Sequence, residues 1–278
     1  MLSHILAVIP TELPSGAVGT SSVSLAAAFN ATLDVAAVGF EQTRMPLIAG
    51  GSVAMASAYE PKYQNALDRA TAALSWVEST AARSNVACRC RPFCLQLESA
   101  AGTLCALARL HDLTVLAQPD DNLSAADSFL ARKILFDSGG PVLFIPPKFE
   151  ERLSMKRVGI CWDGSRLAAR ALHDAMPLLS TAEMVGIINV EVDNAISTEA
   201  SPSRLFQYLT EMKLPCQEFN LASDRSRIVP TILSLASDES IGLLVMGAYG
   251  HAPIIESVFG GVTFNMLRRM SIPTLMSH

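Results

Sequence analysis

The sequence is poor in charge. Only 17% of its 278 residues are charged, and the formal net charge is −5; an average globular protein has about 25% charged residues. No run of Lys and Arg is longer than a pair such as Arg268-Arg269. Because binding to nucleic acid or to an anionic lipid surface needs a basic face, we expect neither nucleic acid nor a membrane among the partners.

Long apolar runs are also missing, although half of the residues are hydrophobic and the mean hydropathy is +0.32. A membrane-spanning helix needs about 20 mostly apolar residues, whereas runs such as 5–9 and 241–246 have the length of a strand. The N-terminus lacks a basic region, and Pro10 breaks its apolar start, so we expect no secretory leader. We therefore expect a cytoplasmic protein with buried, apolar strands.

Several motifs of enzymes and nucleotide-binding proteins are absent. The sequence has no Walker lysine, no G-x-G-x-x-G, no G-x-S-x-G elbow and no H-E-x-x-H. His173 and Asp174 are adjacent on an expected helix, so their side chains diverge and do not form a relay. We therefore expect no catalytic residue and no metal ligand.

Three of the six cysteines, Cys88, Cys90 and Cys94, lie close together. Their even spacing places them on one face of an extended strand, which Pro92 is expected to interrupt. Zinc sites combine such a group with a second pair of ligands, and that pair is missing here. Structural thiols are the first interpretation, and a metal or redox role is the alternative.

What the sequence does contain is a pattern of elements that occurs twice. Strand-like runs alternate with helix-like stretches, which is typical of a parallel sheet with crossover helices. The expected strands are 4–9, 34–40, 86–96, 113–117 and 141–146, then 156–162, 183–191, 215–221, 241–246 and 272–276. The expected helices are 17–31, 61–84, 99–111 and 125–137, then 166–179, 201–212, 225–238 and 261–270.

This pattern predicts two α/β domains, 1–147 and 155–278. Each would have a five-stranded parallel sheet with helices on both faces, and the two would pack through their closing strands. The first half is longer, and its excess falls in 42–60, a stretch rich in Gly, Ser, Ala and Met. Since loops longer than about a dozen residues are usually functional or disordered, we predict a mobile loop there.

A glycine-rich segment of the second half carries a chemical signal. Gly247 ends an apolar strand, Gly250 follows it, and Gly260 and Gly261 open a helix. Glycine lets a backbone approach a ligand, and a helix N-terminus offers amides to an anion; Thr263 adds a hydroxyl. The pattern indicates an anion cradle without a lysine, and the alternative is an ordinary turn followed by a helix cap.

Asp163 follows the first strand of the second half, in the sequence Asp163-Gly164-Ser165. Ligands of open α/β sheets bind at the carboxyl ends of the strands, where Asp163 would accept hydrogen bonds from a base or a sugar. The alternative is that Asp163 or Ser165 only caps the following helix.

The G-x2-G-x9-G spacing of Gly247, Gly250 and Gly260, together with Asp163-Gly164-Ser165, resembles the universal stress protein (UspA-like) superfamily. The resemblance covers 156–278, whereas the first half matches only in its pattern of elements, so the whole chain resembles a tandem member. The resemblance implies two Rossmann-like (adenine nucleotide alpha hydrolase-like) domains. It also implies a stress-response regulator or sensor that binds ATP, AMP or ADP, with Mg as an accompanying ion.

The resemblance also assigns roles to residues. Asp163 would approach the adenine or ribose, Val190 would line the adenine pocket, and Met246 and Gly247 would line the ribose side. The phosphates would be held by Gly250, Gly260, Gly261, Val262 and Thr263. The ATP-binding pattern has Ser or Thr where this sequence has Gly261, and the lost hydrogen bond is worth about 1 kcal/mol.

The first half departs further from that pattern. Its counterpart of Asp163 is Pro10, and its fourth strand runs into Gln118-Pro119-Asp120-Asp121, where two acidic residues would repel a phosphate. We therefore predict no nucleotide in the N-terminal half, and a homodimer through apolar sheet edges. A scaffold of the same fold that binds no nucleotide is the alternative, and a slow ATPase is a third hypothesis.

Overall fold

The structure is a computed structural model that describes residues 1–11, 16–40, 53–121, 123–149, 153–191, 196–248 and 261–278, with the backbone alone for 53–60. The first half contains β1 (His4–Ile9), α1 (Gly16–Phe29), β2 (Thr32–Phe40), α2 (Val53–Arg83), β3 (Cys88–Leu95), α3 (Leu97–Ala108), β4 (Leu113–Ala117), α4 (Ala125–Asp137) and β5 (Val142–Ile145). The second half contains β6 (Arg157–Cys161), α5 (Arg166–Leu179), β7 (Met184–Glu191), η1 (Thr198–Ala200), α6 (Pro202–Glu211), β8 (Cys216–Ala222), η2 (Arg225–Arg227), α7 (Ile228–Asp238), β9 (Leu243–Gly247), α9 (Val262–Arg269) and β10 (Thr274–Ser277).

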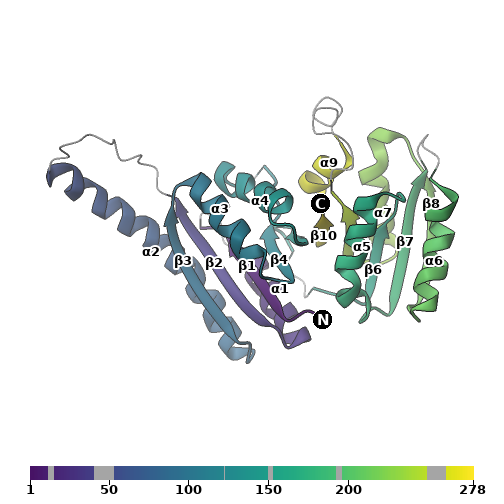
Figure 1. Ribbon diagram of the computed structural model, residues 1–278, viewed down its shortest axis with the longest axis horizontal. Coiled ribbons are helices and arrows are strands. Elements are labelled where there is room, and N and C mark those ends of the chain that lie inside the picture. Colours follow the sequence, from purple (N-terminus) through teal and green to yellow (C-terminus); the bar gives the residue numbers. More distant parts are fainter. Residues whose placement is uncertain (12–15, 41–52, 122, 150–152, 192–195, 249–260) are drawn as a thin grey trace.

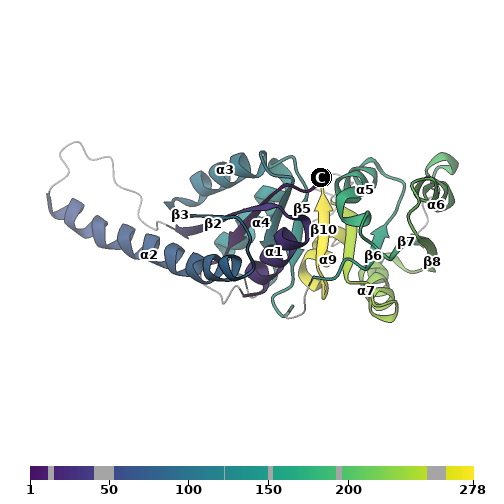
Figure 2. The same ribbon diagram turned by 90° about the horizontal axis from the view of Figure 1, so that it is seen from below.

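The ten strands form one sheet in the order β3-β2-β1-β4-β5-β10-β9-β6-β7-β8 (Figure 1). Neighbouring strands within each half are parallel. The halves join where β5 and β10 pair antiparallel, with Leu143 opposite Leu275, and Figure 2 shows β10 at this central position. The predicted fold class and the packing through the closing strands are confirmed, and the two expected sheets are continuous.

Helices cover both faces of the sheet, which explains the low charge of the sequence. One hydrophobic cluster combines the strands with α1, α2, α5 and α6, and the cluster on the other face combines them with α3, α4, α7 and α9. Both clusters run through both halves. Strands that are covered on both faces need continuous apolar runs, and β5 is buried at every residue.

The largest departure from the expected elements is α2. Pro61 is typical of a first helical turn, yet α2 begins at Val53 and runs through that proline. The prediction of a loop over 42–60 is therefore wrong for 53–60. Pro61 removes one backbone hydrogen bond from α2, because proline has no amide donor, and the helix continues on both sides of it. Residues 42–52 lie outside the described residues. Figures 1 and 2 show α2 extending past the edge of the sheet.

Candidate functional site

The carboxyl ends of β9, β6 and β7 lie side by side in the second half. Cys161 of β6 is in register with Met246 of β9 and with Ile188 of β7, so Asp163 and Val190 each follow this row by two residues. β6 opens the half and has later strands on both sides, which makes this edge the topological switch point where ligands of such sheets bind. The structure therefore brings Asp163, Val190, Met246 and Gly247 to one edge.

The turn after β6 fixes the backbone around Asp163. The Asp163 carboxylate accepts a hydrogen bond from the Ser165 amide at 2.9 Å, and the Ser165 hydroxyl accepts one from the Ala168 amide at 3.1 Å. Gly164 has a φ of +70°, which favours glycine. Ser165 is thus a helix cap, as the alternative interpretation holds, and Asp163 stands exposed in a rigid turn.

Gly247 has a packing role at the end of β9. A Cβ atom at this position would lie 2.6 Å from the carbonyl carbon of Leu167 and 2.7 Å from the amide nitrogen of Ala168. Only glycine therefore lets the first turn of α5 pack against the end of this strand. The same close approach brings the N-terminus of α5 to the edge where Asp163 lies.

The phosphate side of the predicted site is described only in part. Gly250 and Gly260 lie outside the described residues. Gly261 is the N-cap of α9 and has no side-chain cap, and the first amides of a helix are the groups that an anion can bind. Val262 opens α9 half-buried, and Thr263 is 4% exposed.

A second segment, residues 196–200 around η1, flanks the site and lies outside the glycine motif. The indole of Trp162 donates a hydrogen bond to the Ala200 carbonyl at 2.8 Å. A Cβ atom at Gly164 would lie 2.7 Å from the Ile196 side chain and 3.2 Å from the same carbonyl. The region around η1 therefore packs against the turn that carries Asp163, and no local pattern in the sequence indicates this contact.

The side chains of this edge do not favour covalent or metal chemistry. Burial raises the pKa of the Cys161 thiol to about 12, and the charge of Asp163 adds to the shift, so this cysteine is neutral at neutral pH. Among the described residues, no three His, Cys, Asp or Glu side chains gather in a way that would hold a metal ion. The described residues of this edge offer a carboxylate at Asp163 and apolar side chains at Val190 and Met246.

Comparison with known proteins gives a consistent result, although no family model matches the chain. The chain is 25% identical over 170 residues to a universal stress protein from Synechocystis sp., a match that covers 59% of this chain and 57% of that protein. A universal stress protein from Archaeoglobus fulgidus DSM 4304 superposes with a TM-score of 0.73 at 15% identity, over 98% of this chain and 97% of the other. The chain has the fold of the universal stress proteins.

A putative universal stress protein from Pseudomonas aeruginosa UCBPP-PA14 is similar as well, with a TM-score of 0.63 at 14% identity over 99% of this chain and 93% of the other. These two solved structures are matched along nearly their whole length. The resemblance to tandem universal stress proteins that the sequence predicts is thus confirmed. Within the part of the chain that the structure describes, no helix is long and apolar enough to cross a membrane.

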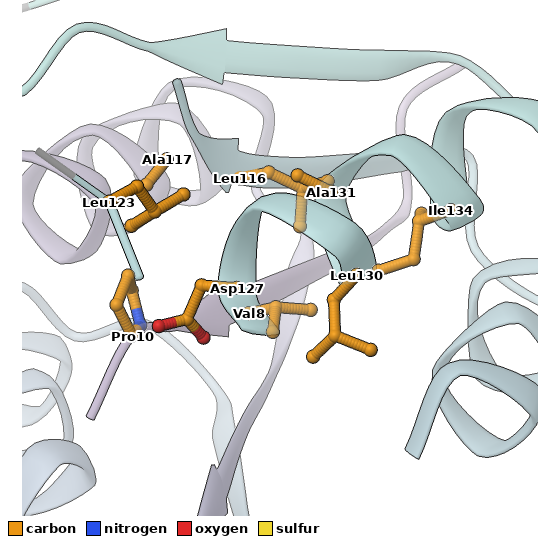
Figure 3. Close-up of a pocket in the computed structure, with 9 residues that line it drawn as sticks. All are labelled: Val8, Pro10, Leu116, Ala117, Leu123, Asp127, Leu130, Ala131 and Ile134. Carbon is orange, nitrogen blue, oxygen red and sulfur yellow. The ribbon is translucent and has the colours of Figure 1, made fainter. Parts of the chain in front are cut away.

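The first universal stress protein-like half has a cavity near the equivalent edge, but the cavity is small. It measures about 20 Å³ and lies between the ends of β1 and β4 and helix α4. Figure 3 shows Pro10, Leu123 and Leu130 around it, with Asp127 as its acidic residue. Since a water molecule needs roughly 10–15 Å³ and ligand pockets measure about 300 Å³ or more, this space suits one water.

Asp120 and Asp121, which follow β4, have different hydrogen-bond partners. Arg268 of α9 donates two hydrogen bonds to the Asp121 carboxylate, at 2.6 and 2.7 Å, while the carboxylate of Asp120 accepts one from the Leu123 amide at 3.2 Å. Pairing with Arg268 reduces the repulsion on which the sequence argument relied. That this half binds no nucleotide stays a prediction.

Proposed function

We propose that the second half binds an adenine nucleotide at the carboxyl edge of β9, β6 and β7, and that the protein acts as a stress-response regulator or sensor. The proposal combines three elements, and the observation that carries it is that the register of β6, β7 and β9 brings the first two of them together at the switch point. The three elements are the exposed carboxylate of Asp163, the glycine end of β9 at Gly247, and the N-terminus of α9 at Gly261.

Each element suits one part of the ligand. The Asp163 carboxylate accepts hydrogen bonds from the adenine or from ribose hydroxyls. Met246 is 5% exposed, and Val190 is half-buried in the same cluster, so Val190 supplies apolar contact to the adenine and Met246 to the ribose side. Val262, Thr263 and Gly261 present the first turn of α9 to the phosphates, where the helix dipole favours negative charge; Mg would accompany the phosphates.

The proposal is tested by isothermal titration of the full chain with ATP, in which we expect one site per chain. In the variant Gly261→Asp, a carboxylate would stand where the phosphates bind, and we expect affinity to fall by about tenfold or more, equal to about 1.4 kcal/mol. Asp is also a good N-cap, so α9 stays folded. Gly261→Asn is the matched control, because it has the same shape without the charge.

Two results would contradict the proposal. No measurable heat from the wild-type chain at millimolar ATP would favour the scaffold that binds no nucleotide. An equal effect of Gly261→Asp and Gly261→Asn would show that no anion binds at the start of α9. Asp163→Ala tests the other end of the site, since the loss of its hydrogen bonds should weaken binding even when α9 is intact.

A further inference from the structure

Cys88 and Cys90 take no part in the proposed site and form a close pair of their own. Their sulfur atoms lie 3.9 Å apart, and both side chains are half-buried. They pack against the hydrophobic cluster that β2 and β3 share with α2. The first two of the three evenly spaced cysteines therefore do share one face of a strand.

The pair lies on an edge of the sheet, where the backbone has freedom to adjust. β3 is the first strand in the sheet order and pairs with β2 on one side. The prediction that Pro92 interrupts this strand is wrong, because β3 runs to Leu95 with Pro92 opposite Ala37. A proline is tolerated there because an edge strand does not need every amide for the ladder.

The two sulfur atoms are chemically different. The Cys88 thiol shares a hydrogen bond with Cys90, which lowers the pKa of Cys90 below its ordinary value and raises the pKa of Cys88. The directions of these two shifts make Cys90 the sulfur that loses its proton first. A thiolate is the form that attacks an electrophile.

We propose that Cys88 and Cys90 are a modification site, a dithiol that a hydroperoxide converts reversibly into a disulfide. The Cys90 thiolate attacks one peroxide oxygen, so that an S–O bond forms, the O–O bond breaks, and the other oxygen leaves as an alcohol or water after taking a proton from solvent. The Cys88 sulfur then attacks the Cys90 sulfur, an S–S bond forms, and the S–O bond breaks. The leaving hydroxide takes the Cys88 proton and departs as water, so two thiols lose two electrons and the peroxide gains them.

The geometry makes this disulfide reachable but strained. Residues two apart on a strand have Cα atoms about 6.6 Å apart, at the upper end of the roughly 4.4–6.8 Å that disulfides span. The sulfur atoms must also approach from 3.9 Å to about 2.0 Å. Strained and exposed disulfides are the easily reduced ones, so this bond would form under peroxide and open again in the presence of a thiol.

The printed sequence allows a direct test, because Arg89 lies between the two cysteines. Trypsin cleaves after Arg89 and spares the Arg91-Pro92 bond, so Cys88 and Cys90 fall into the peptides 84–89 and 90–109. The full chain carrying Cys94→Ser and Cys105→Ser leaves Cys90 as the one cysteine of the second peptide. This protein is reduced, treated with hydrogen peroxide, alkylated and digested without a reductant, and the peptides are then weighed.

We expect the two peptides to be joined after peroxide, in a monomeric chain lighter by two hydrogen atoms. The joined product should fall by about tenfold or more after incubation with glutathione. Adding Cys90→Ser or Cys88→Ser to the same background should abolish it, and thermal melts should show that these chains are folded. The proposal is overturned if the peptides stay separate, if the link joins two chains, or if Cys90 is oxidised to a sulfinate with Cys88 still alkylated.

Discussion

The two halves share a strand order but differ in the side chains at equivalent strand ends. In the first half, Asp34 near the start of β2 is 5% exposed and binds Arg89 at 2.6 Å and His111 at 3.0 Å. By register the equivalent position in β7 is Gly186, and the position equivalent to His111 is Ile241. At these two positions the first half is charged and the second is apolar, and the amino edge of the second half has other ion pairs instead, Lys156 with Glu183 and Arg157 with Glu239.

At the carboxyl end of the opening strand the difference is reversed, because the first half is apolar there and the second half is charged. The first half has Pro10 there and a cavity of about 20 Å³, whereas the second half has the exposed Asp163 and the glycine end of β9. The fold is kept in both because the strands and the covering helices supply the apolar burial. Under the proposed function, a few positions at the strand ends decide what each half can bind, and the apolar burial that holds the fold is the same in both.

The largest expected difference between the halves concerns two strand glycines. A Cβ atom at Gly39 would lie 1.9 Å from the backbone oxygen of Ala66, so α2 would have to move away from β2. At Gly186 it would meet the ring edge of Phe219 at 2.8 Å, and a side chain can turn aside. We expect Gly39→Ala to lower the free energy of unfolding by about 3 kcal/mol or more, and Gly186→Ala by about 1 kcal/mol.

Denaturant titration of each variant measures both effects. Gly102→Ala is the control, since no heavy atom lies within 4 Å of its Cβ position and alanine favours a helix by up to about 1 kcal/mol. Equal losses for Gly39→Ala and Gly186→Ala would mean that α2 is not held against β2 as tightly as the structure indicates.

The next effect separates the ion pair of the buried Asp34, at the amino edge of the first half, from an exposed ion pair at its carboxyl edge. Burial raises the pKa of Asp34, but the hydrogen bonds from Arg89 and His111 outweigh burial, and the pKa lies below its ordinary value of 3.8. Asp34→Asn removes these charge-assisted bonds and should lower the free energy of unfolding by about 2 kcal/mol at neutral pH. Asp121→Asn breaks an exposed pair and should cost less than about 1 kcal/mol.

The sign of the pH dependence follows from the direction of the shift. A carboxyl group with a lowered pKa stabilises the folded state above pH 3.8, the ordinary value, and this stability is lost as the pH falls through the lowered folded value. The wild-type chain should therefore lose stability in acid more steeply than Asp34→Asn. Denaturant titrations at a series of pH values around 3.8 measure the free energy of unfolding of both chains. If the two curves against pH are parallel, Asp34 is not the group that causes the loss of stability in acid.

The sequence was informative where the structure depends on local patterns. Helices 125–137 and 166–179 and strand 113–117 have the predicted bounds, because apolar periodicity and capping residues act within a few positions. The same logic predicted that Asp163 and Gly247 lie at one edge, because the carboxyl ends of parallel strands meet there.

Long-range partners were not predictable in this way. Asp34 and His111 are 77 positions apart, and neither the pairing of Trp162 with Ala200 nor that of Asp121 with Arg268 leaves a mark on the sequence around it. Pro61 gave a local signal for the start of a helix, but α2 begins eight residues earlier, at Val53. Local rules thus predicted which residues share the carboxyl edge, and tertiary contacts decided which residues pack around them.

The smallest expected effect bears on how far the second half has diverged from nucleotide-binding universal stress proteins. Gly261 stands where that pattern has Ser or Thr, and Gly261→Ser restores a hydroxyl at the N-cap of α9. A restored hydrogen bond to a phosphate is worth about 1 kcal/mol, or about fivefold in ATP affinity. Because Ser also caps a helix better than Gly by a few tenths of a kcal/mol, thermal melts without ATP must accompany the titrations. A gain in affinity beyond the gain in helix stability places the phosphates at α9, whereas a more stable helix with unchanged affinity means that the nucleotide binds without this contact.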